Sequence, residues 1–272
     1  MKRALARTGV YLSLVIATLV VVLPIAIVVL GSFKTDQEFL TTGPLTPPTN
    51  WLNVTNFVTA FRDGNMLSGF ANTIVVLAFA VTGTILIGAS AAYAIDRFGF
   101  RGRSVVLALF LVATLVPGVT TQVATFQIIN GIGLYNTIWA GVLLFMGTDI
   151  ISIYIFWQFI RAIPRSLDEA ATLDGAGHLR IFFRIILPNL KPAIATVVII
   201  KGIAIYNEFY IPYLYMPDHK TIATSLFAFK GPFGSQWEVI SAGVVIILVP
   251  TLIAFLALQR YIYNGFTSGA TK

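Results

Sequence analysis

The sequence predicts an all-α membrane protein with six transmembrane helices and both termini in the cytoplasm. Hydrophobic residues make up 57% of the 272 residues, charged residues make up only 11%, and the mean hydropathy is +0.86. Soluble domains carry about 25% charged residues, so this chain has too few charges to cover a surface that faces water. This composition excludes a soluble enzyme and a disordered tail. The chain contains no cysteine, which excludes disulfides and thiolate metal sites.

The first two transmembrane helices are predicted at residues 9–31 and 71–95. A transmembrane helix needs about 20 mainly apolar residues, and the stretches 8–33 and 64–95 contain no charge. Basic residues precede the first stretch, as they do in a signal peptide. The apolar run nevertheless exceeds the roughly 7–15 residues of a signal-peptide core, and no small-residue cleavage site follows it. We therefore expect an uncleaved first helix that contains Pro24.

The third and fourth helices come from one long apolar run. Residues 104–148 carry no charge over 45 residues, which is too long for a single span. The sequence Asn-Gly-Ile-Gly at 130–133 is a turn signal, and it divides the run into helices at 104–129 and 135–160. Within the third helix, Pro117-Gly118 indicates a local break or a kink.

The fifth and sixth helices complete the predicted set. Proline is favoured in the first turn of a helix, so Pro192 indicates the start of a helix at 191–212. The last apolar run predicts a helix at 239–259. The segment 32–70 contains several prolines, which indicates an irregular, interfacial segment rather than a soluble domain. We expect residues 1–272 to form a single transmembrane domain.

Lysine and arginine are distributed unevenly between the two sides of these helices. With the N-terminus in the cytoplasm, the two tails and the loops 96–103 and 161–191 carry thirteen of the 18 basic residues, whereas the outer loops carry four. Cytoplasmic loops of membrane proteins carry an excess of lysine and arginine. The distribution therefore favours six spans with both termini inside.

Small residues recur at a spacing of four along the second helix: Ala80, Thr84, Gly88 and Ala92. In lipid, small residues on one helix face allow neighbouring helices to approach closely. We expect this stripe to pack within a helix bundle.

The cytoplasmic loop 161–190 is longer than the roughly 2–8 residues that usually connect two helices. Ser166 and Glu169 have the spacing of a capping box, with Ser166 as the N-cap of a short helix. Asp174-Gly175 predicts the turn that ends this helix, since glycine adopts backbone conformations that other residues avoid.

A second amphipathic helix follows the turn and ends at Leu187-Pro188. Its apolar and basic residues fall on opposite faces. These residues are Ile181, Phe182 and Ile185 on one face, with Arg180 and Arg184 on the other. Two short helices that protrude between two spans are suited to docking with another protein.

The residues of this loop resemble the EAA loop of the permease subunits of binding-protein-dependent ABC importers. The match lies in the order and spacing of Glu169-Ala170-Ala171, Gly175, Ile185 and Leu187-Pro188, before the next-to-last span on the cytoplasmic side. Other segments resemble the carbohydrate-uptake branch of this family and its six-span, maltose-permease-like subunits. These segments are Gly31–Lys34, Ala91–Ala94 with Arg97, Tyr206–Phe209, Gln259-Arg260 and Gly265–Lys272.

The resemblance implies the fold of a type I ABC importer permease and a mechanism. The first helix of the loop would sit in a cleft of a cytoplasmic ATPase, and closure of the ATPase dimer on ATP would turn the bundle from inward-facing to outward-facing. The residues expected to couple to the ATPase are Glu169, Ala170, Ala171, Asp174, Gly175, Ile185, Leu187 and Pro188. The C-terminal residues expected to contact it are Ser268, Gly269, Ala270, Thr271 and Lys272.

The resemblance also implies partners. They are a second permease subunit, two cytoplasmic ATP-binding subunits, an extracytoplasmic sugar-binding protein and the lipid bilayer of a bacterial or archaeal inner membrane, without nucleic acid. ATP and Mg would bind to the partner ATPase, and this chain would carry no cofactor and no metal. The implied cargo is an oligosaccharide or disaccharide, and the alternative within the same class is glycerol phosphate or another polyol.

Three ionisable residues fall within the predicted spans: Asp149, Lys201 and Glu208. Such groups are costly in lipid and usually face a cavity or a partner. At a rise of 1.5 Å per residue, Asp149 and Lys201 lie roughly 15–17 Å from the cytoplasmic ends of their helices, so they can pair near the midplane. Lys201 and Glu208 are seven residues apart, which places them on one helix face. Together with Asn207, these residues are candidates for the substrate path; the alternative is a structural ion pair or a contact with the partner permease.

The remaining classes of function are disfavoured. No Gly-x4-Gly-Lys-Ser/Thr sequence occurs, so we expect ATP hydrolysis on a partner chain and no enzymatic activity here. His178 and His219 fall on opposite sides of the membrane and cannot share a metal. A proton-coupled secondary transporter is the alternative, with Asp149 and Glu208 as proton relays. It would have no use for the docking loop, and the sequence lacks the clear inverted repeats that typify such transporters.

Overall fold

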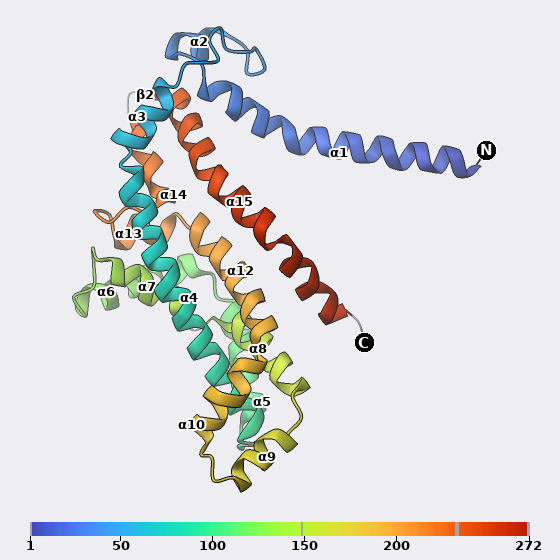
Figure 1. Ribbon diagram of the computed structural model, residues 1–272. Helices are drawn as coiled ribbons and strands as arrows, with labels where there is room; N and C mark the ends of the chain where they lie inside the picture. The colour runs from blue at the N-terminus through green and yellow to red at the C-terminus, as the bar shows by residue number, and fades with distance from the viewer. Residues whose placement is uncertain (1, 148, 232–233, 271–272) are drawn as a thin grey trace. The chain divides into compact units, whose positions relative to one another are not determined.

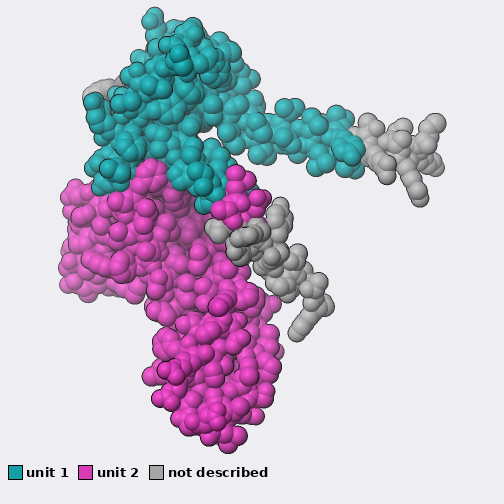
Figure 2. Space-filling model, viewed as in Figure 1, with its two compact units in different colours: residues 1–68, 224–255 teal, residues 69–223, 256–272 magenta. Residues whose placement is uncertain are grey.

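The computed structural model describes residues 2–147, 149–231 and 234–270, and it is mostly helical (Figure 1). The side chains of residues 2–8, 258 and 260–270 are not described. The chain forms two compact units (Figure 2). Unit 1 comprises residues 1–68 and 224–255, and unit 2 comprises residues 69–223 and 256–272.

The elements of unit 1 are α1 (Lys2–Ser32), α2 (Asp36–Thr41), α3 (Thr55–Asp63), the 3-10 helix η3 (Leu226–Phe229), the antiparallel strands β1 (Lys230–Gly231) and β2 (Gly234–Ser235), and the first part of α15 (Trp237–Ala270). Those of unit 2 are most of α4 (Met66–Arg97), α5 (Arg103–Thr114), the 3-10 helix η1 (Gly118–Thr121), α6 (Gln122–Gly131), α7 (Ile138–Met146), α8 (Ile150–Ala162), α9 (Ser166–Leu173), α10 (His178–Ile181), the π-helix η2 (Phe182–Ile186), α11 (Leu187–Asn189), α12 (Lys191–Asn207), α13 (Tyr210–Tyr215) and the start of α14 (Ile222–Ser225).

In the part of the chain that the structure describes, three single helices are long and apolar enough to cross a membrane. They lie at Gly9–Ser32 in α1, Met66–Arg97 and Trp237–Ala257 in α15. These segments agree with the first, second and sixth predicted helices. Pro24 lies inside α1, as expected. The helix α15 continues beyond the predicted end of the sixth helix.

The third predicted helix is broken. The helices α5 and η1–α6 are bent by 92°. The break falls at Leu115–Pro117, and Pro117 has an extended backbone (φ −63°, ψ 129°). Proline lacks the N–H that would continue the helix, and it disfavours the helical conformation in the residue before it. A continuous helix over 104–129 is therefore wrong, whereas the break that Pro117-Gly118 indicated is confirmed.

The fourth and fifth predicted helices are also divided. Over 135–160, α7 ends at Met146 and α8 begins at Ile150. The helix predicted at 191–212 begins at Lys191, with proline in its first turn, but it ends at Asn207, before the separate helix α13. A bend of 74° separates α12 from the segment His178–Asn189. With each bent pair counted as one span, the described residues provide up to six candidate spans, by length and composition alone.

The main core of unit 2 joins α4 and α8 to the segment around residues 171–197. Its fully buried members include Phe156 and Ile160 of α8 and Ala92 of α4. A Cβ added at Gly88 would lie only 3.2 Å from a ring carbon of Phe156, so the absence of a side chain allows α4 to approach α8. The predicted packing of the small-residue stripe on α4 is therefore confirmed.

The segment 32–70, most of which belongs to unit 1, is more regular than predicted, because it contains α2 and α3. Thr35 and Glu38 form a reciprocal capping box at the start of α2. Lys34 is 2% exposed, and its ammonium group donates to Thr42 Oγ1 (2.9 Å) and to the carbonyl of Gly43 (2.8 Å). These contacts order the chain directly after α1.

Candidate functional site

Helix α9 is the first of the two short helices that the sequence predicts in the loop 161–190. At its C-terminus, Ala176 N–H donates to Ala171 O (2.9 Å) and Gly175 N–H donates to Thr172 O (3.0 Å), the two hydrogen bonds of a Schellman motif. Gly175 has φ +79°, a left-handed conformation that side chains disfavour. The predicted glycine turn is confirmed, and it directs the chain from α9 into α10.

The predicted capping box at the start of α9 is wrong. The residue before the helix is Arg165, which has helical dihedral angles (φ −64°, ψ −23°), and no side chain caps this end of the helix. Glu169 N–H donates to Arg165 O at 3.1 Å, so the first turn already includes Arg165. An N-cap residue needs an extended backbone, and Ser166 is inside the helix.

The two sides of α9 differ in exposure. Ala171 is buried and Asp168 is half-buried, whereas Glu169, Ala170 and the C-cap residue Asp174 are exposed. Large apolar side chains are also exposed on and near α9: Leu167, Leu173, Leu179 and Phe183. Leu173 is 90% exposed, which is unfavourable for an apolar side chain in water. These four side chains form the exposed apolar part of the loop 161–190.

The segment α10–α11 anchors the loop to the rest of unit 2. Ile185 and Leu187 are half-buried and pack against the core, whereas Pro188 is exposed. The buried residues of this segment are Ile181, Phe182 and Ile186, while Arg180 and Arg184 are exposed, which confirms the predicted amphipathic pattern. Of the predicted coupling residues, Ala171, Ile185 and Leu187 therefore lie toward the core. Figure 1 shows α9 and α10 together at one end of unit 2.

A cluster of charged residues at the end of α4 was not identified from the sequence. Arg97 Nη1 donates to Asp96 Oδ2 at 2.9 Å, and Arg97 Nε lies 3.1 Å from Asp168 Oδ2. Arg103 and Arg165 lie 3.6 and 3.7 Å from Asp96. The sequence feature that could have revealed this cluster is Asp96, an acidic residue in the segment 96–103, whose other charged residues are basic.

Asp149 and Lys201 form the ion pair that their equal depth predicted. Lys201 Nζ lies 3.1 Å from Asp149 Oδ2, and the two side chains are 19% and 15% exposed. Asp149 is also the N-cap of α8, and its carboxylate accepts hydrogen bonds from Ser152 N–H (3.4 Å) and Ser152 Oγ (2.9 Å). The pair thus joins α12 to the first turn of α8.

Asn207 and Glu208 have other contacts. Glu208 follows the end of α12, and its Oε1 accepts a hydrogen bond from Tyr210 N–H at 2.8 Å. Asn207 Nδ2 donates to Ile203 O at 2.9 Å. The prediction that Lys201 and Glu208 share one helix face is wrong, because α12 ends before Glu208.

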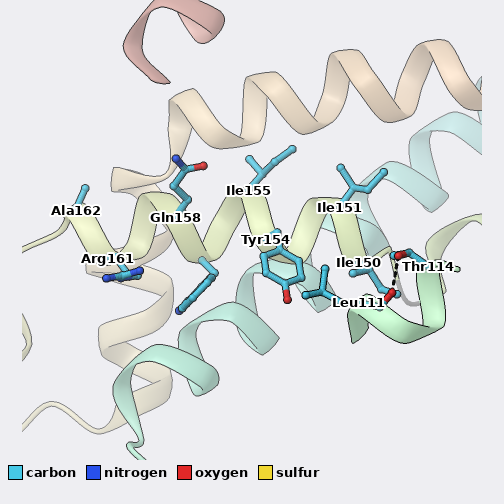
Figure 3. Close-up of a pocket in the computed structure, with 10 residues that line it drawn as sticks. Leu111, Thr114, Ile150, Ile151, Tyr154, Ile155, Gln158, Arg161 and Ala162 are labelled. Atoms are coloured by element: carbon cyan, nitrogen blue, oxygen red, sulfur yellow. Dashed lines mark hydrogen bonds between the residues drawn. The ribbon is translucent and has the colours of Figure 1, made fainter. Parts of the chain in front are cut away.

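A groove of about 760 Å³ lies along α8 (Figure 3). It begins at Ile150, directly after Asp149, and none of the predicted substrate-path residues lines it. The guanidinium carbons of Arg161 and Arg103 lie 5.2 and 5.4 Å from the centre of the Trp157 ring. The lining residues are Leu111, Thr114, Ile150, Ile151, Tyr154, Ile155, Trp157, Gln158, Arg161 and Ala162. Aromatic rings beside amide and guanidinium groups offer both stacking surfaces and hydrogen-bond donors to a polar solute.

Of the predicted C-terminal contact residues, Ser268, Gly269 and Ala270 belong to the end of α15, whereas Thr271 and Lys272 lie outside the described residues.

A family model places this geometry among known proteins. The model described as "Binding-protein-dependent transport system inner membrane component" matches residues 84–267. This range contains the loop with α9, the charged cluster at the end of α4 and the pair of Asp149 and Lys201.

Individual relatives cover most of the chain. The Bacillus subtilis (strain 168) protein described as "Probable ABC transporter permease protein YurM" is 32% identical over 98% of this chain and 89% of its own length. The "Melibiose/raffinose/stachyose import permease protein MelC" of the same organism is 31% identical over 80% of each chain. A solved chain from a bacterial ABC transporter involved in the import of the acidic polysaccharide alginate has a TM-score of 0.79 at 21% identity, over 95% of this chain and 96% of that one, so the two share a fold.

Proposed function

Because the chain belongs to the binding-protein-dependent transport system inner membrane component family, we propose that it is the permease subunit of an ABC importer for an oligosaccharide or disaccharide. The family confirms the resemblance that the loop residues indicated. The cargo is supported by MelC, which is named for the import of melibiose, raffinose and stachyose. Glycerol phosphate or another polyol is the alternative cargo in the same class. The chain is a transport subunit, and it carries no P-loop sequence for ATP.

The proposed topology is one transmembrane domain of six spans: α1, α4, the bent pair of α5 and α6, the bent pair of α7 and α8, the segment 191–212 that begins with α12, and the first part of α15. Both termini and the loop with α9 face the cytoplasm of a bacterial or archaeal cell. The excess of lysine and arginine in the tails and in loops 96–103 and 161–191 supports this orientation. Backbone breaks at membrane depth are tolerated where they are buried in protein or line a cavity.

The observation that carries the proposed coupling is the exposed surface of α9. Glu169, Ala170 and the apolar Leu173 project from a helix that the core holds in place through Ala171. We propose that this surface docks into a cytoplasmic ATP-binding subunit, so that closure of an ATPase dimer moves α9 and then the bundle as rigid bodies. The partners are two such ATPase subunits with ATP and Mg, a second permease subunit and an extracytoplasmic sugar-binding protein. The C-terminal residues 268–272 are a second proposed ATPase contact.

The proposed substrate path includes the ion pair of Asp149 and Lys201, with Asn207 and Glu208 farther along the chain. Partly exposed, charged side chains within spans suit a polar path for sugar hydroxyl groups. A structural ion pair that only joins α8 to α12 is the alternative, and the uptake measurements in the Discussion distinguish the two.

The test is purification of the assembled transporter, followed by identification of the co-purifying subunits and of the saccharides that the binding protein retains. We expect an ATP-binding subunit and a saccharide-binding protein, and uptake into proteoliposomes that depends on ATP. Uptake that ignores ATP but stops with a proton ionophore would instead establish a proton-coupled transporter. Retention of a polyol phosphate would change only the cargo.

A further inference from the structure

Helix α9 is attached to the end of helix α4 by charged side chains with little access to water. Asp96 and Arg97 end α4, and Asp168 lies in the first turn of α9. Arg97 contacts both carboxylates, at 2.9 Å from Asp96 and 3.1 Å from Asp168. The side chains of Arg97, Asp96 and Asp168 are only 7%, 5% and 15% exposed.

Backbone contacts strengthen the same attachment. Arg97 Nη2 donates to the carbonyl of Ile163 at 3.0 Å, and Arg165 Nη2 donates to the carbonyl of Asp96 at 2.9 Å. Ile163 and Arg165 belong to the segment that connects α8 with α9. The start of α9 is therefore fixed to α4 both directly and through its connecting segment.

Asp168 depends on Arg97 for its charge partner. Among the described residues, the Arg97 guanidinium is the one positive charge in contact with Asp168, and the Tyr93 hydroxyl, also on α4, is a neutral hydrogen-bonding neighbour of the same carboxylate. A shielded carboxylate without a partner is costly, so the attraction to Arg97 holds Asp168 in place. Asp96 stabilises the arginine from its other side.

The two neighbouring carboxylates of α9 face different surroundings. Asp168 is half-buried and contacts Arg97, whereas Glu169 is exposed on the surface proposed to dock with the ATPase. One side of the helix is thus available to a partner, while the other is tied to α4.

We propose that Arg97 is a positioning residue that fixes α9 to α4 through Asp168, so that a movement of the docked helix is passed to α4 instead of being absorbed by the loop. The transport part of this inference rests on the proposed function. The attachment itself does not, because it concerns contacts within this chain.

The first test measures the attachment directly. The chain has no cysteine, so Ser90→Cys on α4 and Leu173→Cys on α9, both at exposed positions, give two specific sites for spin labels. In the purified full chain we expect a narrow distance distribution. Asp168→Asn should broaden it, whereas the control Asp63→Asn, which removes an exposed pair with Arg62, should leave it unchanged. An unchanged distribution in Asp168→Asn would overturn the proposal.

The second test measures transport per ATP hydrolysed in proteoliposomes that contain the whole assembly. Asp168→Asn should lower this ratio about tenfold, in the range that coupling residues produce, while the ATPase subunit still co-purifies. Asp168→Glu, which keeps the charge, should restore most of the ratio. A normal ratio in Asp168→Asn, or loss of the ATPase subunit from the complex, would contradict a positioning role. If the wild-type assembly shows no ATP-driven uptake but the spin-label result holds, the proposed function fails and the attachment stands.

Discussion

Lys201 Nζ on α12 lies 3.1 Å from Asp149 Oδ2, and the same carboxylate caps the first turn of α8 through Ser152. The Asp149 side chain therefore accepts a hydrogen bond from one of the free N–H groups at the start of α8 and also balances the charge of a lysine within a candidate span. Removal of either partner leaves the other charge without compensation in a poorly hydrated place.

The stability of the chain should reflect this pairing. Lys201→Met should lower the free energy of unfolding by about 3 kcal/mol, because Asp149 keeps an uncompensated charge. The double variant Lys201→Met/Asp149→Asn should recover most of this loss, since no charge remains and asparagine also caps helices. Thermal unfolding of the detergent-purified chain measures both effects. Equal destabilisation in the single and double variants would mean that the charges do not interact.

The same two positions test the proposed substrate path. Lys201→Met and Asp149→Asn should each reduce saccharide uptake or change the preference among saccharides, because the pair would no longer present its charges to the sugar hydroxyl groups. Uptake into proteoliposomes, corrected for the amount of assembled transporter, is the measurement. Normal uptake with unchanged preference in both variants would assign the pair to structure alone.

The Schellman motif at the end of α9 predicts a specific requirement for glycine at position 175. Gly175→Ala places a side chain at φ +79° and should destabilise the turn by about 1 kcal/mol. Hydrogen exchange of the amides of residues 171–176 should accelerate. Gly177→Ala is the matched control, since Gly177 has φ −75° and open space around a new Cβ. Equal exchange in the two variants would show that the left-handed conformation is not required.

The segment after α1 should be sensitive to acid. Hydrogen bonds from the Thr49 side chain and from the backbones of Thr35 and Thr49 lower the pKa of Glu38 from 4.5 to about 2. A carboxyl whose pKa is lowered on folding stabilises the fold at high pH, and this contribution declines as pH falls from about 4.5 toward about 2. Exchange protection of residues 35–49, corrected for intrinsic rates, should fall over this range. Glu38→Gln should flatten the dependence; an unaltered profile in that variant would assign the acid sensitivity to another group.

Composition and apolar run length were sufficient to locate the three single helices that are long and apolar enough to cross a membrane, because the cost of exposing charge to lipid acts on whole segments. The helix breaks were harder to predict. Pro117 indicated the break in the third predicted helix. The start of α8 at Ile150 depends on Asp149 as the N-cap, and the sequence alone does not distinguish a capping aspartate from one that is buried within a helix. The contact between Asp149 and Lys201 was predicted correctly, because the sequence places the two residues at similar distances from the cytoplasmic ends of their predicted helices.

The loop was predicted in outline but not in its attachment. The glycine turn and the amphipathic second helix follow from local patterns, and both are present. The N-cap role of Ser166 failed because Arg165 already has helical dihedral angles, so the helix starts before Ser166 could cap it. The link from Arg97 to Asp168 spans distant parts of the sequence, and no local pattern encodes it.

The central claim, that α9 docks into an ATP-hydrolysing partner, is tested most directly by cross-linking from one introduced cysteine. In the cysteine-free chain, Leu173→Cys places a thiol at a position that is 90% exposed on α9. With a cysteine-directed photo-cross-linker in native membranes, we predict a covalent product that contains an ATP-binding subunit. A product with lipid or with no protein, obtained while the assembly remains active, would contradict the docking of α9.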